Sequence, residues 1–247
     1  MFEELKGKKL LVMDRTALAA CAVKRAKELG IRTVVANFYP EAQSPSKQIA
    51  DEKVDIDISD IDAMVALIRE RGVDGIFVGW TDSHLPFYAQ ICERAGLPCC
   101  GNLEQFDILS NDKRRFKEVC RQYGVPTPTQ YFVTPAFERD VMDGIEYPVM
   151  VKPADGSGSR GIRRCDCEKE LRAHFMKLYE ASASKKIVVE KYIESPHEIF
   201  IHYTVQDGEP SLSCAFTKYK TKAETQSAAS CVFHFFAPDF MESYQAT

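Results

Sequence analysis

The sequence lacks several features that would each assign it to a class of protein. No apolar run reaches the roughly 20 residues that a membrane-spanning helix needs, and residues 1–5 lack the basic start and apolar stretch of a secretory signal. Positive charge is not in excess, because 32 lysines and arginines stand against 36 aspartates and glutamates. We therefore expect no membrane partner, no broad basic surface for nucleic acid, and a cytoplasmic location.

A cysteine framework is also missing. The nine cysteines are an odd number and have no pairing rhythm. Cys165 and Cys167 stand too close for the usual zinc knuckle, and no second CxxC or HxxxH arm accompanies them. The sequence thus predicts reduced thiols that mostly act as small buried hydrophobes, and no metal site.

The first hundred residues alternate between predicted strands and helices. Strands are predicted at 9–13, 33–36 and 74–80, the last of them buried on both faces. Helices follow from Thr16 to Gly30, from about Ser59 to Gly72 with Asp62 completing an approximate capping box, and over 85–96. This alternation is typical of a parallel sheet with helices packed on it.

Two strand ends in this half bear on ligand binding. The first strand-to-helix turn, residues 14–17, has no glycine, which argues against a dinucleotide site. Asp82 and His84 follow the strand that ends at Trp80, where open α/β sheets often bind ligands. Helix capping by Thr81 or Asp82, with an incidental histidine, is the interpretation that we favour.

The alternation of strands and helices ends after a predicted helix at 111–123. Its apolar stripe is predicted to be Phe116, Val119, Cys120 and Tyr123, and Gly124 with two following prolines ends it. Strands are then predicted at 147–151, 187–190, 199–205 and 212–216, with one helix at about 168–181. We expect a second domain of the α+β class.

A glycine-rich segment follows the strand at 147–151. Gly156, Gly158 and Gly161 match G-x-G-x-x-G, but residues 162–165 continue extended, whereas a Rossmann loop would open a helix. The pattern favours a strand–loop–strand flap whose backbone N–H groups cover phosphate oxygens, with Lys152 and Arg160 as cations. A tight hairpin with surface charges is the alternative. No Walker A sequence and no protein-kinase motif is present.

Two further segments fit a nucleotide. An apolar strand at 187–189 leads into Glu190, and Tyr192 and Ile193 offer apolar surface for an adenine ring, while Glu198 suits the ribose hydroxyls. Residues 112–116 form a basic first turn of a helix, where the macrodipole disfavours cations, and such a violation often marks function. Solvated strand ends and a solvated helix start are the alternatives.

Taken in order, these segments resemble the ATP-grasp superfamily. The likeness is greatest to the large-chain synthetase units of carbamoyl-phosphate synthase, and residues 190–194 are also similar to biotin carboxylase. It implies a parallel-sheet pre-ATP-grasp α/β domain at 1–105 and an ATP-grasp domain at 106–247. The second domain would consist of a lid subdomain at about 126–188 and an incomplete C-terminal subdomain at about 189–247.

The resemblance also implies an ATP site and a reaction. The family phosphorylates a small carboxylate or bicarbonate with ATP, and an amine or ammonia then displaces the phosphate. A homodimer is compatible with the family. Lys113 and Lys152 would contact the phosphates, and the flap would consist of Gly156, Ser157, Gly158, Ser159, Arg160 and Gly161. The adenine hinge would consist of Glu190, Lys191, Tyr192 and Ile193, and Glu198 would hold the ribose.

One part of the family pattern is missing. The family binds magnesium through acidic residues late in the second half, followed by a catalytic arginine, and nothing after Phe216 supplies that set. Asp239 and Glu242 lack the strand context. We therefore assign no catalytic residue. Either the sequence is a piece of a longer ligase, whose magnesium ligands we expect beyond Thr247, or the protein is a naturally short relative. A non-catalytic nucleotide-binding module and a biotin-carboxylase-like bicarbonate activator remain as alternatives.

Overall fold

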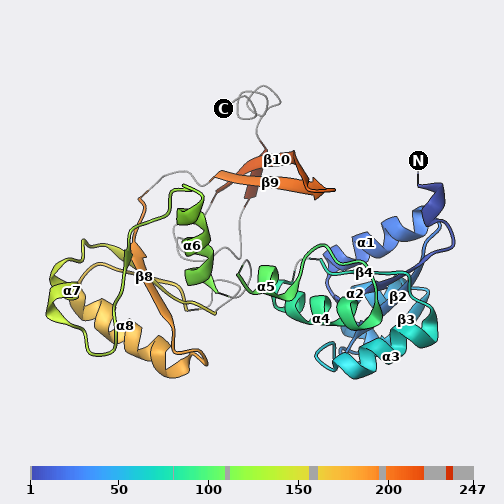
Figure 1. The fold of residues 1–247 in the computed structure, drawn as a ribbon, viewed down its shortest axis with the longest axis horizontal. Helices are drawn as coiled ribbons and strands as arrows, with labels where there is room; N and C mark the ends of the chain where they lie inside the picture. The colour runs from blue at the N-terminus through green and yellow to red at the C-terminus, as the bar shows by residue number, and fades with distance from the viewer. Residues whose placement is uncertain are drawn as a thin grey trace. The chain divides into compact units, whose positions relative to one another are not determined.

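A computed structural model gives the fold of the chain (Figure 1). It describes residues 2–79, 81–108, 112–155, 161–194, 199–219 and 232–235. The chain divides into two compact units, Met1–Phe116 and Lys117–Thr247, and each is described by itself. In the described part of the chain, every helix is too short or too polar to cross a bilayer.

The first unit is built on a parallel sheet. Its strand order is β3-β2-β1-β4, and β1 pairs in parallel with both β2 and β4. Chain order runs outward from β1 in one direction to β3, and β4 lies on the other side of β1. The strands are β1 (Lys9–Val12), β2 (Arg32–Asn37), β3 (Glu52–Asp55) and β4 (Gly75–Phe77).

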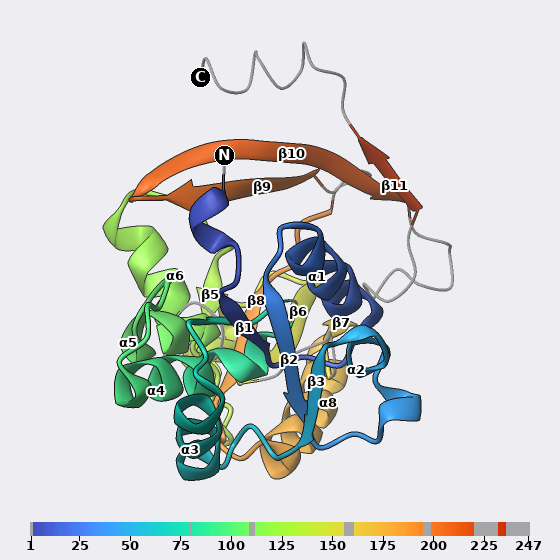
Figure 2. The same cartoon turned by 90° about the vertical axis from the view of Figure 1, so that its right-hand side faces the viewer.

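Alternating side chains of the two central strands bury both faces of this sheet. Leu11 and Val34 pack on one face with Met64 and Ile91 of helices α3 (Ile61–Arg71) and α4 (Leu85–Ala95). Val12 packs on the other face with α1 (Ala17–Glu28), which lies on the opposite side of the strands from α3 (Figure 2). The predicted parallel sheet with helices packed on it is confirmed.

Side-chain caps fix the starts of the longer helices. The Thr16 hydroxyl accepts a hydrogen bond from the Ala19 N–H, as the sequence predicted. In α3 the cap is Asp60, which accepts from the Ala63 N–H at 3.0 Å, so the predicted capping box from Ser59 to Asp62 is wrong by one residue. The remaining helices of this unit are α2 (Pro45–Ile49), α5 (Leu103–Phe106) and the start of α6 (Lys113–Gln122).

Two features of this unit differ from the sequence prediction. Helix α2 and strand β3 were not predicted, because their residues are short, polar and without a clear period. The buried residues of α2 include Lys47, whose ammonium donates to the Asn37 and Tyr39 carbonyls and pairs with Asp55. Strand β4 ends at Phe77 and is only half buried, because it lies at an edge of the sheet.

The second unit contains an antiparallel sheet of order β5-β8-β6-β7. Helix α8 packs on it through Leu171, Phe175 and Leu178, and the rings of Phe175 and Phe137 meet edge-on at 5.4 Å. The elements are β5 (Gln130–Tyr131), α7 (Arg139–Asp143), β6 (Val149–Pro153), β7 (Arg163–Cys165), α8 (Glu168–Ala181) and β8 (Ile187–Lys191).

A second sheet of three antiparallel strands follows in the chain. Strand β9 (Ile199–Gln206) and strand β10 (Glu209–Tyr219) form a long hairpin (Figure 1), and β11 (Val232–Phe235) pairs with β10. The tight turn places Asp207 and Gly208 at positive φ. Both hairpin strands were predicted, β9 nearly to its full length and β10 only over 212–216. Strand β11 was not predicted.

Candidate functional site

The two faces of the β5-β8-β6-β7 sheet have opposite character. Val149 and Val151 of β6 and Val189 of β8 point into the core against α8, and all three are fully buried. Lys152, which follows Val151, and Glu190, which follows Val189, must lie on the other face, because side chains alternate along a strand. The sheet therefore separates a hydrophobic core on one side from charged groups on the other.

Glu190 is the centre of the charged face. It is only 6% exposed, and its carboxylate pairs with the ammonium groups of both Lys152 and Lys117. Met150 stands directly opposite Glu190 in the ladder, so Lys152 is its diagonal neighbour on the adjacent strand. One buried and one half-buried cation on one carboxylate give the cluster a net positive charge, which suits a polyanionic ligand.

Lys117 is the member of this cluster that the sequence analysis missed. It is 7% exposed and is the buried residue of α6, whereas Phe116 and Tyr123 of the predicted apolar stripe are exposed. The predicted stripe is therefore wrong at Phe116 and Tyr123, while Val119 and Cys120 are half-buried, and the side chain that α6 buries is the one that pairs with Glu190. Burial, followed by the charge of Arg121, lowers the pKa of Lys117. A lysine four residues after Lys113 gave no separate signal in the sequence.

The ends of the glycine-rich segment have the predicted topology. Strands β6 and β7 pair antiparallel, with Val151 opposite Arg163, so the chain continues as a strand at 163–165, where a Rossmann loop would continue as a helix. Gly161, the last flap residue, has a φ of +76°, and a Cβ there would come within 2.8 Å of Leu178 Cδ2. Its carbonyl contacts His174 Nε2 at 2.9 Å. Glycine is thus required where the segment re-enters the sheet.

The predicted adenine hinge follows β8 directly. The Lys191 N–H donates to the Thr129 carbonyl and the Tyr192 N–H to the Pro148 carbonyl, which fixes the backbone of this segment. The Lys191 ammonium pairs with Glu146 at 2.6 Å, and Glu146 holds the pKa of Lys191 above its ordinary value. Arg164 lies 4.8 Å from the centre of the Tyr192 ring, and Ile193 is exposed.

The basic start of α6 is compensated locally. The Asp112 carboxylate accepts hydrogen bonds from the backbone N–H groups of Arg114 and Arg115, as an N-cap does. The Arg115 guanidinium pairs with Asp107 at 2.9 Å. The expected conflict with the macrodipole is thus reduced by these carboxylates. Lys113 belongs to the first unit and Lys152 to the second, so their convergence on one phosphate chain stays a prediction.

Several predicted site residues lie outside the described part of the chain. They are Gly156, Ser157, Gly158, Ser159, Arg160 and Glu198, and the roles given to them stay predictions. Asp239 and Glu242 also lie outside it. Among the residues that are described, no three His, Cys, Asp or Glu side chains gather as a metal site would require. The eight described cysteines, Cys165 and Cys167 included, are free thiols.

Comparison with known proteins assigns both units. Residues 112–210 match the family model described as the carbamoyl-phosphate synthase L chain, ATP binding domain, and residues 6–105 match the biotin carboxylase, N-terminal domain. Fold and site together define an α/β domain followed by an ATP-grasp fold. The chain belongs to the ATP-grasp superfamily, with the family's ATP-binding domain in its second part.

Individual relatives are carboxylases and ligases. The small subunit of 2-oxoglutarate carboxylase from Hydrogenobacter thermophilus is 33% identical over 211 residues, which are 78% of this chain and 44% of that protein. The solved biotin carboxylase domain of that enzyme, in complex with MgADP, ADP and bicarbonate, superposes with a TM-score of 0.77 at 27% identity. That match covers 97% of this chain and 56% of the domain.

A more distant solved structure shares the fold alone. It is an L-amino acid ligase from Bacillus licheniformis, with a TM-score of 0.76 and 19% identity over 98% of this chain and 58% of the ligase. The chain thus spans about half the length of the relatives that it matches.

Proposed function

We propose that the protein binds ATP on the charged face of the β5-β8-β6-β7 sheet and activates bicarbonate or a small carboxylate as an acyl phosphate. An amine or ammonia then attacks the activated carbon. The observation that carries the proposal is the cluster of Lys152, Glu190 and Lys117, in which Lys152 lies on β6, the strand that precedes the glycine-rich segment. The match of residues 112–210 to an ATP-binding domain supports it.

The proposed reaction has two steps. A carboxylate oxygen attacks the γ-phosphorus, the bond from that phosphorus to the β–γ bridging oxygen breaks, and ADP leaves. The amine then attacks the acyl carbon, the bond to the phosphate oxygen breaks, and inorganic phosphate leaves. Lys152 would stabilise the negative charge on the transferred phosphoryl oxygens. We also assign Lys113 and the backbone of residues 156–161 to the phosphates, as the sequence predicted.

Because Glu190 is shared by two lysines, Lys152 can move away without leaving the buried carboxylate unpaired. Glu190 holds two cations, so Lys117 can remain paired with it when Lys152 turns toward a phosphate. A buried carboxylate left without any partner would cost several kcal/mol, and Lys117 removes that cost. The backbone that follows, through Ile193, would receive the adenine edge, and Glu198 would receive the ribose.

The remaining parts of the proposal concern what surrounds the site. Magnesium finds no ligand set among the described residues, so we assign no residue of this chain to it. We propose a homodimer, in line with the dimer described for the 2-oxoglutarate carboxylase domain. The free thiols of the described cysteines favour a cytoplasmic location. The predicted domains at 1–105 and 106–247 and their subdomains stay as proposed.

Isothermal titration with ATP and magnesium tests the nucleotide assignment. We expect saturable binding by the wild type, a loss of at least tenfold in affinity for Lys152→Ala, and unchanged affinity for Lys169→Ala. Lys169 is the matched control because it is an exposed lysine of the same unit, on α8. Absence of binding, or equal binding by both variants, would exclude the assignment.

The relatives favour bicarbonate as the activated group. Release of ADP should therefore rise when bicarbonate is added to the enzyme with ATP and magnesium, in the presence of free biotin or an amine. ATP binding without turnover under every condition would favour the second candidate, a nucleotide-binding module that performs no chemistry.

A further inference from the structure

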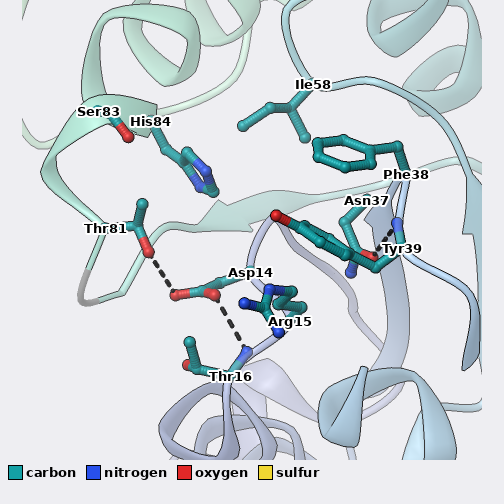
Figure 3. A pocket seen from close by; sticks show the side chains of 10 residues that line it. All are labelled: Asp14, Arg15, Thr16, Asn37, Phe38, Tyr39, Ile58, Thr81, Ser83 and His84. Atoms are coloured by element: carbon teal, nitrogen blue, oxygen red, sulfur yellow. Dashed lines mark hydrogen bonds between the residues drawn. The ribbon is translucent and has the colours of Figure 1, made fainter. Parts of the chain in front are cut away.

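A pocket lies within the first unit. Its volume is about 290 Å³, and it sits where the strands of the parallel sheet end (Figure 3). The side chains that matter for its chemistry are Asp14, Arg15, Phe38, Tyr39, Ile58 and His84. They come from the segments that follow β1, β2, β3 and β4, so all four strands contribute.

The position is one where parallel sheets bind ligands. Chain order reverses at β1, which has β2 on one side and β4 on the other. At such a switch point the loops leave the sheet in opposite directions and open a crevice at the carboxyl ends of the strands. A volume of 290 Å³ lies at the small end of the range for ligand pockets, which suits a molecule the size of a metabolite.

The floor of the pocket is a fixed acidic group. Asp14 is only 2% exposed, and its two oxygens accept hydrogen bonds from the Thr16 N–H at 3.1 Å and the Thr81 hydroxyl at 3.0 Å. The favoured capping interpretation is therefore wrong: the Thr81 side chain reaches across to β1, and it makes no cap hydrogen bond. Figure 3 shows the Thr81 hydroxyl directed at the Asp14 carboxylate.

Arg15 provides a cation at the same place. Its guanidinium lies 4.2 Å from the centre of the Tyr39 ring and donates to the Gln43 carbonyl at 3.4 Å. Among the described residues it forms no ion pair, so most of its donors are available to a ligand. Stacking on the ring holds the guanidinium plane in position, which is the arrangement that favours recognition of a carboxylate.

His84 provides a polar group that lacks a partner. Its Nδ1 atom is buried and has no hydrogen-bond partner among the described residues. Burial lowers the pKa of His84, so the ring is neutral near pH 7. A neutral imidazole has one acceptor nitrogen, and in the tautomer that carries its proton on Nε2 a ligand N–H or O–H would satisfy Nδ1.

We propose that this pocket binds a small organic acid that also carries an N–H or O–H donor, as amino acids and hydroxy acids do. The carboxylate would lie at the Arg15 guanidinium, and the donor would lie at His84 Nδ1. The hydrocarbon part would pack against Ile58 and the rings of Phe38 and Tyr39, which line the same pocket. The proposal concerns binding by the first unit and does not require that the second unit binds ATP.

Four matched probes test the proposal by isothermal titration of the full chain without ATP. Leucine and 2-hydroxy-4-methylpentanoate carry both groups, 4-methylpentanoate lacks the donor, and 3-methylbutylamine lacks the carboxylate. We expect the first two to bind at least tenfold more tightly than the other two. Titration of ATP on the same samples reports on the second unit separately, so failure of either proposal is distinguishable from failure of the other.

Variants then locate the binding. Arg15→Gln should weaken both acids at least tenfold, His84→Phe should abolish the preference for donor-bearing acids, and Arg25→Gln should change nothing. Arg25 is the control because it lies on the same loop–helix segment and pairs only with Glu28 at the surface. If Arg15→Gln does not fold, Ser83→Trp should block the pocket from its exposed rim. No saturable binding by any of the four probes, or equal binding by wild type, Arg15→Gln and His84→Phe, would overturn the proposal.

Discussion

Two buried carboxylates, one in each unit, are held in different ways. Glu190 is surrounded by charge, since both of its described partners are lysine ammonium groups. Asp14 is held by neutral donors, a backbone N–H and a hydroxyl. The comparison shows that burial of a carboxylate does not by itself identify its role. Cationic partners make Glu190 part of a charged cluster, whereas neutral donors make Asp14 a fixed point of the loop structure.

The two sheets explain this difference. Helices cover both faces of the parallel sheet in the first unit, so polar groups are confined to the strand ends, where Asp14 lies. In the second unit α8 covers one face of an antiparallel sheet, and alternation places Lys152 and Glu190 on the other face. Ligand chemistry is thus expected at a sheet edge in one unit and on a sheet face in the other.

The largest effect that separates the two carboxylates should come from Glu190→Gln. Removing its charge leaves the buried Lys117 ammonium without its carboxylate partner, and breaking a buried pair in this way costs about 3–5 kcal/mol. Denaturant unfolding monitored in the second unit should show the loss. The control is Glu146→Gln, whose partner Lys191 is held at the surface. A loss no greater than that of the control would contradict the electrostatic account of Glu190.

Backbone strain in the second unit gives the next effect. Gly161→Ala places a Cβ at φ +76° and within 2.8 Å of Leu178 Cδ2, whereas Gly124→Ala meets the same strain at φ +70° with no atom within 4 Å. Left-handed strain costs about 1–2 kcal/mol in both variants, and the Leu178 contact adds to it only in the first. The difference in unfolding free energy between the two variants therefore measures the contact. Equal losses would show that Leu178 moves aside freely.

A smaller effect is expected when Asp14 loses its charge. Asp14→Asn retains an acceptor oxygen for the Thr16 N–H, and the Thr81 hydroxyl can rotate to accept from the new amide. The cost should be about 1 kcal/mol in the unfolding free energy, as for one weakened hydrogen bond. Chemical denaturation of the full chain measures it. A loss as large as that of Glu190→Gln would mean that Asp14 neutralises a cation after all.

The sequence predicted the regular parts of both units and missed the places where charge is buried. Hydrophobic periodicity located the helices that bury an apolar face, such as α1 and α3. Lys47 and Lys117 were missed because a lysine is expected to be solvated unless its partner is known. Only the fold brings Lys47 to Asp55 and Lys117 to Glu190. For the pocket, the sequence offered ligand binding at Asp82 and His84 but favoured capping, because the pocket is assembled from four strand ends and nothing in the sequence linked His84 to Arg15.

The smallest expected effect compares the two units through pH. Burial lowers the pKa of His84 in the first unit. Burial also lowers the pKa of His174 in the second unit, where the charges of Arg163 and Lys177 add smaller effects in the same direction. Below the ordinary histidine value of about 6.5 the unfolded chain takes up protons that the folded chain does not. Stability is therefore complete above that pH and falls as the pH drops through the lower folded values. Unfolding midpoints measured between pH 7.5 and pH 5 should show this decline, and His174→Gln should reduce it for the second unit alone. If the decline is the same in wild type and in His174→Gln, the protons are taken up by other groups, and the contact of His174 with the Gly161 carbonyl does not contribute to the pH dependence.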